Sequence, residues 1–372
     1  MNPGFARICL LAVVLMSTTQ CKKQPEFITY SADSPVFKYT GRVHMNDQRE
    51  LELVSSAAAV QFRFSGDSVT VHLRNQAGGD DYNYVTIIVD SLVTGRFPVK
   101  GDDIRTLGIK AGHSPRMHHL SCVKATEAIN GLLLFAGASA TRIEAEEPSD
   151  RDQILFIGNS ITCGMGGDTS EVPCGAGKWY DQHDAYYAYG PRLARMLGVD
   201  YVLNSVSGIG IYRRWNDDGP DMPLVYDHLY FDTTSSVEWD DHRVNPDIIS
   251  IALGTNDLSP GDGIHARDPF NPEVFIRDYV DFAHRLYRRY PQARFILLSS
   301  PMESGANATE LERCLAAVQS QLNNSYPDRH PVETFFFHSI DRPGGCSGHP
   351  SDHDHELMAQ ELEPAFRKLL GD

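Results

Sequence analysis

The sequence has few basic residues for its length. Its 372 residues include 33 lysines and arginines against 49 aspartates and glutamates, which gives a formal net charge of −16 at pH 7. Proteins that bind nucleic acid need a basic surface that displaces counterions from the phosphates, so this balance argues against nucleic acid as a partner. It also disfavours a polyanionic substrate. A neutral small molecule or a neutral polysaccharide is compatible with it.

The sequence also lacks an apolar run long enough to cross a membrane. The apolar segment from Ile8 to Met16 is much shorter than the ~20 residues that a spanning helix needs, but it fits the core of an export signal. Cys21 stands where a bacterial lipoprotein carries its lipidated cysteine, although Gln20 occupies a position at which a small residue is usual. We therefore expect residues 1–21 to be an export signal of the lipoprotein type. The mature protein would lie in the periplasm or at the cell surface, and would touch the membrane only through lipid on Cys21.

Cysteine is sparse and irregularly spaced. Outside the signal region, five cysteines remain: Cys122, Cys163, Cys174, Cys314 and Cys346. Their spacing is not that of a zinc site. Cys163 and Cys174 lie in one polar loop and could pair in an oxidising compartment; the alternative is that both are unpaired, semi-buried thiols. An odd total leaves at least one thiol free.

The length is typical of two domains, and the two halves of the chain have different patterns. Residues 27–146 consist of short, alternating apolar segments separated by Gly, Asp and Asn, without a long amphipathic helix. Residues 68–74, with Val69, Val71 and Leu73 on one side, are typical of them. Further strands are predicted at 59–66, 84–90, 117–125 and 131–137. We predict a β-sandwich, or jelly roll, over residues 27–146.

A charged segment that contains a proline, residues 144–152, has the composition of a linker. After it, apolar segments alternate with helical ones. Strands are predicted at 154–158, 200–207, 246–254, 294–300 and 332–338, and helices at 188–198, 275–290, 308–323 and 351–370. This alternation predicts an α/β domain over residues 152–372, in which helices cover both faces of a parallel five-stranded sheet.

Small or polar residues follow the predicted strands. They are Ser160 after the first strand, Gly208 after the second, Asn256 and Asp257 after the third, and His349 before the last helix. The carboxyl ends of parallel strands meet at one edge of a sheet, where ligands bind. A hydroxyl nucleophile, an imidazole base and N–H donors for an oxyanion are the groups that acyl transfer needs. The sequence therefore predicts an acyl-transfer site at this edge.

These motifs, in this order, resemble those of the SGNH (GDSL-like) hydrolase superfamily. They are GNSIT at 158–162, the glycine at 208, GTND at 254–257 and HP at 349–350. The upstream β domain with CVKATEAINGLLLFAG at 122–137, together with GIGIYRRWND at 208–217, is similar to carbohydrate esterase family 2. That family is associated with removing acetyl groups from plant polysaccharides such as xylan and glucomannan. The resemblance implies a flavodoxin-like SGNH domain behind a jelly-roll-like domain, and an esterase that needs no cofactor.

The resemblance also implies a role for each residue at the predicted site. Ser160 would attack the acetyl carbonyl and form an acetyl-serine intermediate, and His349 would take its proton and deliver it to the leaving sugar oxygen. The backbone N–H groups of Ser160 and Gly208, with the side chain of Asn256, would hold the oxyanion. Asp257 is expected to fix the loop that carries Asn256. No metal is expected.

One part of the superfamily pattern is missing. The superfamily usually has an aspartate two or three residues before the histidine, where this chain has Ser347 and Cys346. We predict a Ser–His dyad in which Nδ1–H of His349 donates to a main-chain carbonyl or to an acid elsewhere in the chain.

The same residues have simpler interpretations. Ser160 could be only a helix N-cap, Gly208 could serve only a tight turn, and Asn256 could be only a turn former. Three histidines within residues 349–355 suggest a zinc site, whereas Ser351 and Asp354 have the spacing of a capping box at a helix start.

Three aromatic residues near the predicted edge are candidates for binding substrate. Trp179, Tyr212 and Trp215 could stack on sugar rings or could pack at the domain boundary. The expected partner is an acetylated polysaccharide or oligosaccharide. Two other functions are compatible with the sequence: a lipase or thioesterase of the same superfamily, and a non-catalytic glycan-binding surface protein.

Overall fold

The computed structural model describes residues 26–114, 116–148, 150–239 and 242–371. The predicted export signal and Cys21 lie outside these residues. In the described ranges, no helix combines the length and the apolar character that crossing a membrane requires.

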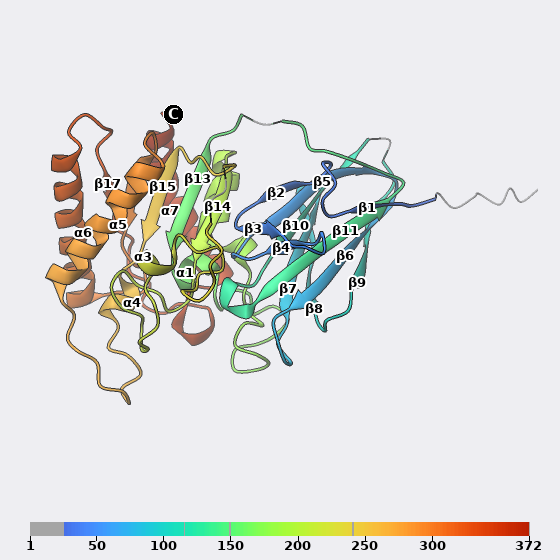
Figure 1. The fold of residues 1–372 in the computed structure, drawn as a ribbon. Helices are drawn as coiled ribbons and strands as arrows, with labels where there is room; N and C mark the ends of the chain where they lie inside the picture. Colours follow the sequence, from blue (N-terminus) through green and yellow to red (C-terminus); the bar gives the residue numbers. More distant parts are fainter. Residues whose placement is uncertain (1–25, 115, 149, 240–241, 372) are drawn as a thin grey trace, which may run out of the picture.

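The N-terminal part of the chain forms two six-stranded antiparallel sheets (Figure 1). The first has the order β3 (Val43–Met45), β4 (Leu51–Leu53), β11 (Leu132–Ala140), β6 (Ser68–Gln76) and β9 (Arg105–Lys110), with β1 (Ile28–Ser31) beside β11. The second has the order β12 (Arg142–Glu144), β5 (Ala59–Ser65), β10 (His118–Lys124), β7 (Asn83–Val89) and β8 (Leu92–Val99), with β2 (Lys38–Thr40) beside β5. Val69, Val71 and Leu73 are fully buried in the core that both sheets share, as their alternation predicts.

Sequence patterns identified only five of these strands. β8, β9 and the short strands β1 to β4 and β12 were not predicted. The sequence of β8, LVTGRFPV, has no clear apolar alternation, and its first residues are exposed, with Leu92 72% exposed. A helical turn, η1 (Ala128–Asn130), lies between β10 and β11.

The C-terminal part forms a parallel sheet of five strands. Their order is β14 (Asp200–Ser205), β13 (Gln153–Gly158), β15 (Ile248–Ala252), β16 (Arg294–Leu298) and β17 (Glu333–Phe335). The long helices are α2 (Tyr189–Leu197), α5 (Pro272–Arg289), α6 (Gly305–Ser325) and α7 (Asp352–Leu370). Short helices are α1 (Ser160–Cys163), η2 (Ala185–Tyr187), α3 (Met222–Val225), α4 (Thr255–Leu258) and η3 (Cys346–Gly348). The predicted fold class, a β-sandwich domain followed by a three-layer α/β domain, is confirmed.

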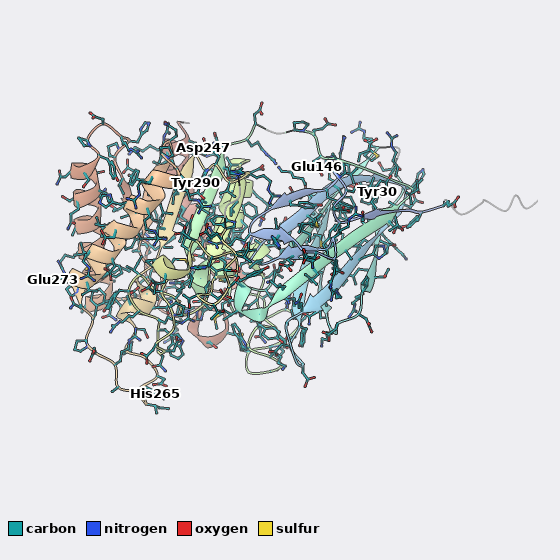
Figure 2. The ribbon with its side chains drawn as sticks, viewed as in Figure 1. Tyr30, Glu146, Asp247, His265, Glu273 and Tyr290 are labelled. Carbon is teal, nitrogen blue, oxygen red and sulfur yellow. A yellow bond between two sulfur atoms is a disulfide. The ribbon has the colours of Figure 1, made fainter. Side chains whose placement is uncertain are left out.

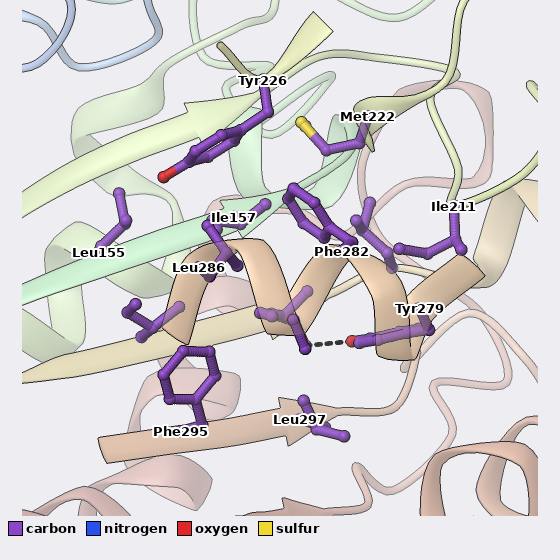
Figure 3. Close-up of a cluster of buried hydrophobic side chains, with 14 of the residues drawn as sticks. Leu155, Ile157, Ile211, Met222, Tyr226, Tyr279, Phe282, Leu286, Phe295 and Leu297 are labelled. Carbon is purple, nitrogen blue, oxygen red and sulfur yellow. Dashed lines mark hydrogen bonds between the residues drawn. The ribbon is translucent and has the colours of Figure 1, made fainter. Parts of the chain in front are cut away.

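Helices cover both faces of this sheet because successive residues of its strands are apolar. Leu155 and Ile157 of β13 belong to the core that contains α5 and α6, whereas Ile154 and Phe156 belong to the core that contains α2 and α7. Figure 3 shows α5 lying over the strands, with the hydroxyl of Tyr279 donating a hydrogen bond to a strand carbonyl.

The two domains lie side by side, with β14 on the side of the parallel sheet that faces the β domain (Figure 1). Arg42 of the β domain is fully buried there. Its guanidinium donates to the side-chain oxygen of Asn204 on β14 at 2.9 Å and to the carbonyls of Tyr226 and His228 at 2.6 Å each. A buried charge that is hydrogen-bonded in this way holds the two domains in one relative position.

The amino ends and the carboxyl ends of the parallel strands lie at opposite edges of the sheet. Figure 2 shows Asp247, which precedes β15, at the opposite end of the molecule from His265 in the loop after α4. The loops at the carboxyl ends of the strands, the end at which His265 lies, carry the predicted site residues.

Candidate active site

Ser160 is the first residue of α1, directly after β13. The N-cap of α1 is Asn159, whose side-chain oxygen accepts a hydrogen bond from the backbone N–H of Ile161 at 3.1 Å. The simpler interpretation of Ser160 as an N-cap is therefore wrong, and its hydroxyl is available for another partner. Gly158 is needed at the end of the strand because a Cβ there would overlap the side chain of Thr162.

The partner of this hydroxyl is His349, which is 189 residues away in the sequence. Nε2 of His349 lies 2.8 Å from Oγ of Ser160. His349 stands just before α7, and Ser351 and Asp354 form a capping box at the start of that helix, as predicted. The imidazole is thus carried by a well-defined helix start rather than by a free loop.

The other ring nitrogen of His349 faces the main chain. Nδ1 lies 3.1 Å from the carbonyl oxygen of Ser347, and among the described residues no carboxylate accepts a hydrogen bond from this ring. Burial lowers the pKa of His349, and the hydrogen bond to the Ser347 carbonyl opposes that shift only in part. The imidazole is consequently neutral at pH 7 and can accept a proton from Ser160.

Besides Ser160, two residues are predicted to hold the oxyanion, Gly208 and Asn256, and they lie on the segments that follow β14 and β15. Gly208 follows β14 and has a φ of 77°, a conformation that favours glycine. Asn256 lies in α4, and its side-chain amide donates to the carbonyl of Ile209 at 2.8 Å, which ties the loop after β15 to the segment that carries Gly208. This bond uses one of the two amide hydrogens of Asn256.

Asp257 has a structural role in this region. It is fully buried, and its carboxylate accepts hydrogen bonds at 3.0 Å from the backbone N–H groups of Ile211 and Tyr212. Burial raises the pKa of Asp257 to about 6, and these hydrogen bonds oppose the shift. Asp257 thus fastens the segment after Gly208 to α4.

The disulfide differs from the pairing that the sequence suggested. Cys174 is bonded to Cys346, not to Cys163. Cys163 is a buried free thiol at the end of α1, 3.2 Å from the hydroxyl of Ser205. Cys163 and Cys174 are close in sequence, but Cys163 is fully buried whereas Cys174 lies in an exposed stretch of the following loop. Cys122 and Cys314 are also buried free thiols.

Comparison with known proteins places the two domains in families. Residues 156–355 match the model of the GDSL-like Lipase/Acylhydrolase family, and residues 39–146 match the model called Carbohydrate esterase 2 N-terminal. The chain belongs to the GDSL-like lipase/acylhydrolase family.

Similar proteins share both domains of this GDSL-like chain. Two proteins of Cellvibrio japonicus (strain Ueda107), each named acetylxylan esterase / glucomannan deacetylase, are 25% and 28% identical to it; the matches cover 98% of the chain and 96% and 98% of those proteins. The structure of a family two carbohydrate esterase from Clostridium thermocellum, in complex with cellohexaose, superimposes with a TM-score of 0.79 at 26% identity, covering 90% of this chain and 99% of that one. A family two carbohydrate esterase from Cellvibrio japonicus gives 0.78 at 25% identity, covering 93% and 98%. The predicted resemblance is confirmed, and the protein is a carboxylic ester hydrolase.

The three aromatic candidates of this GDSL-like esterase have different environments. Trp215 is 42% exposed; its backbone N–H donates to the carbonyl of Gly208 at 2.9 Å, and its ring lies against Gly208. Trp179 is also exposed, and its ring contacts the ring of His183 edge-on. Tyr212 is half-buried, packs against the domain core and accepts a hydrogen bond from the backbone N–H of Asn271 at 3.0 Å. Of the three, Trp215 is placed beside a predicted oxyanion residue.

The three histidines of segment 349–355 have separate partners in this esterase. His349 faces Ser160, His353 is exposed beside Glu356, and the buried His355 accepts from the backbone N–H of Tyr189. In the part of the chain that the structure describes, no three His, Cys, Asp or Glu side chains are grouped as metal ligands.

Sequence reasoning missed one buried side-chain pair next to the site. Glu127, in the loop between β10 and β11, lies 3.2 Å from Nε2 of His183, and both side chains are completely buried. Glu127 comes from the β domain and His183 from the loop before η2. A single acidic residue in a predicted β domain carries no local signal that would connect it with the esterase site.

Proposed function

We propose that this protein is a serine esterase that removes O-acetyl groups from a neutral plant-type polysaccharide or oligosaccharide, such as acetylated xylan or glucomannan. The single observation that supports this most directly is the 2.8 Å contact between Oγ of Ser160 and Nε2 of His349. It is a nucleophile and a base in hydrogen-bonding contact at the carboxyl edge of the sheet. The names of the similar proteins support the choice of acetylated polysaccharide.

The first half of the reaction acylates the enzyme. Oγ of Ser160 attacks the acetyl carbonyl carbon while its proton passes to Nε2 of His349. The carbonyl of Ser347 stabilises the imidazolium by accepting from Nδ1–H. The negative charge that develops on the acetyl oxygen is held by the N–H groups of Ser160 and Gly208 and by the amide of Asn256. His349 then gives the proton to the leaving sugar oxygen, and the acetyl group stays on Ser160.

The second half reverses these roles with water. His349 removes a proton from a water molecule, which attacks the acetyl-serine carbonyl, and the same three donors hold the oxyanion. The intermediate collapses to acetate, and the proton on His349 returns to Oγ of Ser160. None of these steps requires a cofactor.

The test compares wild-type enzyme with the Ser160→Ala and His349→Ala variants. Substrates are p-nitrophenyl acetate, p-nitrophenyl butyrate, acetylated xylan and acetylated glucomannan, and acetate release is measured. We expect the wild type to prefer acetate over butyrate and both variants to lose most of the activity. Acetate release that does not depend on Ser160 would refute the serine mechanism. A strong preference for butyrate would favour a lipase, and glycan binding without hydrolysis would favour a non-catalytic role.

We further propose that the protein is exported and anchored by lipid on Cys21, on the sequence pattern of residues 1–21. Cell fractionation tests this. Wild-type protein should be found with membranes, and the Cys21→Ala variant should not.

A further inference from the structure

Glu127 belongs to the β domain, but its side chain points into the α/β domain. It stands at the N-cap position of η1 without capping that helix, and its side chain is completely buried. A buried carboxylate is costly unless it is well hydrogen-bonded, so the identity of its partners shows what it does.

The main partner of Glu127 is Ser207, the residue directly before Gly208. One carboxylate oxygen of Glu127 accepts from the backbone N–H of Ser207 at 2.7 Å, and the other accepts from the Ser207 hydroxyl at 2.5 Å. Two bonds to a single residue fix both the position and the orientation of this peptide. The next N–H along the chain is that of Gly208, which the proposed mechanism uses for the oxyanion.

Glu127 also contacts the other segment of the oxyanion site. The thiol of Cys163 lies 3.6 Å from the same carboxylate oxygen that binds the Ser207 N–H. Cys163 is the last residue of α1, and Ser160 is the first. One carboxylate therefore touches both segments that carry the proposed main-chain oxyanion donors.

Further contacts hold Glu127 itself in place. His183 supplies another donor to the carboxylate, at 3.2 Å. The side-chain nitrogen of the buried Lys124 donates to the carbonyls of Glu127, Gly131 and Val54, which fixes the loop from which the Glu127 side chain extends. Burial alone would raise the pKa of Glu127, but the hydrogen bonds from His183 and Ser207 bring it below its ordinary value.

We propose that Glu127 is a positioning residue for the esterase reaction, through which the β domain holds the Ser207–Gly208 segment and α1 at the separation that the oxyanion requires. This inference rests on the proposed function. It gives the β domain a part in catalysis that is independent of any contact with glycan. A shift of the oxyanion donors should lower kcat more than it changes KM, because these donors act mainly on the transition state.

The experiment uses two substitutions at Glu127 and the same two at a matched position. Glu127→Gln keeps an oxygen that can accept from the Ser207 N–H, whereas Glu127→Met has similar length and only a weakly accepting thioether sulfur. The control is Glu52 on β4, which is 7% exposed and accepts from the hydroxyl of Tyr230 in the other domain at 2.6 Å. Glu52 is thus also a buried acid at the domain interface, but no contact joins it to Ser207 or Cys163. Each variant of the full-length enzyme is assayed for kcat and KM on p-nitrophenyl acetate and for its melting temperature.

We expect Glu127→Met to lower kcat by about 10- to 100-fold with KM within about threefold, since small displacements of catalytic groups have effects of this size. Glu127→Gln should retain substantially more kcat than Glu127→Met. Glu52→Gln and Glu52→Met should keep kcat within about twofold even where they lower the melting temperature. The inference would be overturned if the folded Glu127→Met variant had the kcat of the wild type. It would also be overturned if Glu52→Met lost as much kcat as Glu127→Met.

Two further measurements keep the result interpretable. If Glu127→Met does not fold, the Ser207→Ala variant tests the inference instead. Loss of the hydroxyl bond to Glu127 should lower kcat by about three- to tenfold at unchanged KM. A kcat within about twofold of wild type would overturn the inference. Ser160→Ala is assayed in parallel. If Ser160→Ala remains active, the proposed function fails; if it is inactive while the Glu127 and Ser207 variants keep full kcat, only the role of Glu127 fails.

Discussion

The disulfide between Cys174 and Cys346 joins residues that are 172 positions apart and ends three residues before the catalytic candidate His349. The same segment is held by main-chain bonds, from the N–H of Cys346 to the carbonyl of Gly166 at 2.9 Å and from the N–H of His349 to the carbonyl of Cys346 at 3.1 Å. In a chain without an aspartate two or three residues before the histidine, this crosslink and the helix start after it hold the backbone segment that carries His349.

Removal of the disulfide should therefore affect both activity and stability. We expect the Cys174→Ser/Cys346→Ser double variant to lose about 2–5 kcal/mol of unfolding free energy, the usual effect of removing a native disulfide. It should also show a several-fold lower kcat, since His349 is less firmly held. Kinetics and thermal melting with and without dithiothreitol provide the measurement. Dithiothreitol should slow the wild type and leave the double variant unchanged; an equal effect on both would show that the reagent acts elsewhere.

Ser347 is expected to contribute its carbonyl rather than its side chain. Ser347→Ala should leave kcat/KM within about twofold, because the oxygen that faces Nδ1 of His349 belongs to the main chain. Ser347→Asp adds an acid where the superfamily has one, and should leave activity within a few-fold or raise it. A loss in Ser347→Ala comparable to that in His349→Ala would show that the hydroxyl takes part.

Asn256 should matter for turnover rather than for substrate binding. Asn256→Ala should reduce kcat by about 10²–10³, which is typical for the loss of one oxyanion donor, with little change in KM. The bond from Asn256 to Ile209 is also lost, so melting temperature is measured in the same variant. A normal kcat in a folded Asn256→Ala enzyme would exclude it from the oxyanion site.

The dependence of activity on pH should follow His349. The imidazole must be neutral to act as a base, and burial lowers its pKa, so the apparent pKa of kcat/KM should lie below the ordinary value of about 6.5. Activity should be constant above this pKa and fall about tenfold per pH unit below it. The assay uses p-nitrophenyl acetate, with tryptophan fluorescence at each pH to detect unfolding. An apparent pKa above 7 would contradict this assignment.

Trp215 should affect large substrates more than small ones. Its exposed ring lies against Gly208, a proposed oxyanion donor, and offers an apolar face there. Trp215→Ala should raise KM for acetylated xylo- or manno-oligosaccharides by about tenfold, as expected for the loss of one aromatic contact, while kcat/KM for p-nitrophenyl acetate stays within about threefold. Equal losses on both substrates would indicate that the ring supports the Gly208 loop instead.

Much of the fold was predictable because its signals are local. The continuous apolar run before Gly158 and the helical periodicity of residues 275–290 are patterns within one short segment, so each can be recognised without knowing what the segment packs against. The predicted helix at 275–290 is α5, which begins three residues earlier, at a proline after the cap Asn271. The edge strands were less predictable because β2 has only three residues, all half-buried, and the first three residues of β8 are exposed.

The catalytic candidates were predictable for a related reason. Ser160 and His349 each lie next to a strand end or a helix start, and parallel strands bring all such positions to one edge. The motif order therefore predicted which residues approach one another, and the structure places the two side chains in contact.

The sequence alone determined the alternation of elements and the sheet edge at which the candidate catalytic residues lie, because both depend on periodicity and chain direction. Only the tertiary structure decided that Cys174 pairs with Cys346 and that Glu127 reaches Ser207, 80 residues away. These contacts depend on how two loops and two domains pack, and neither a lone cysteine nor a lone glutamate carries a local pattern that reports its distant partner.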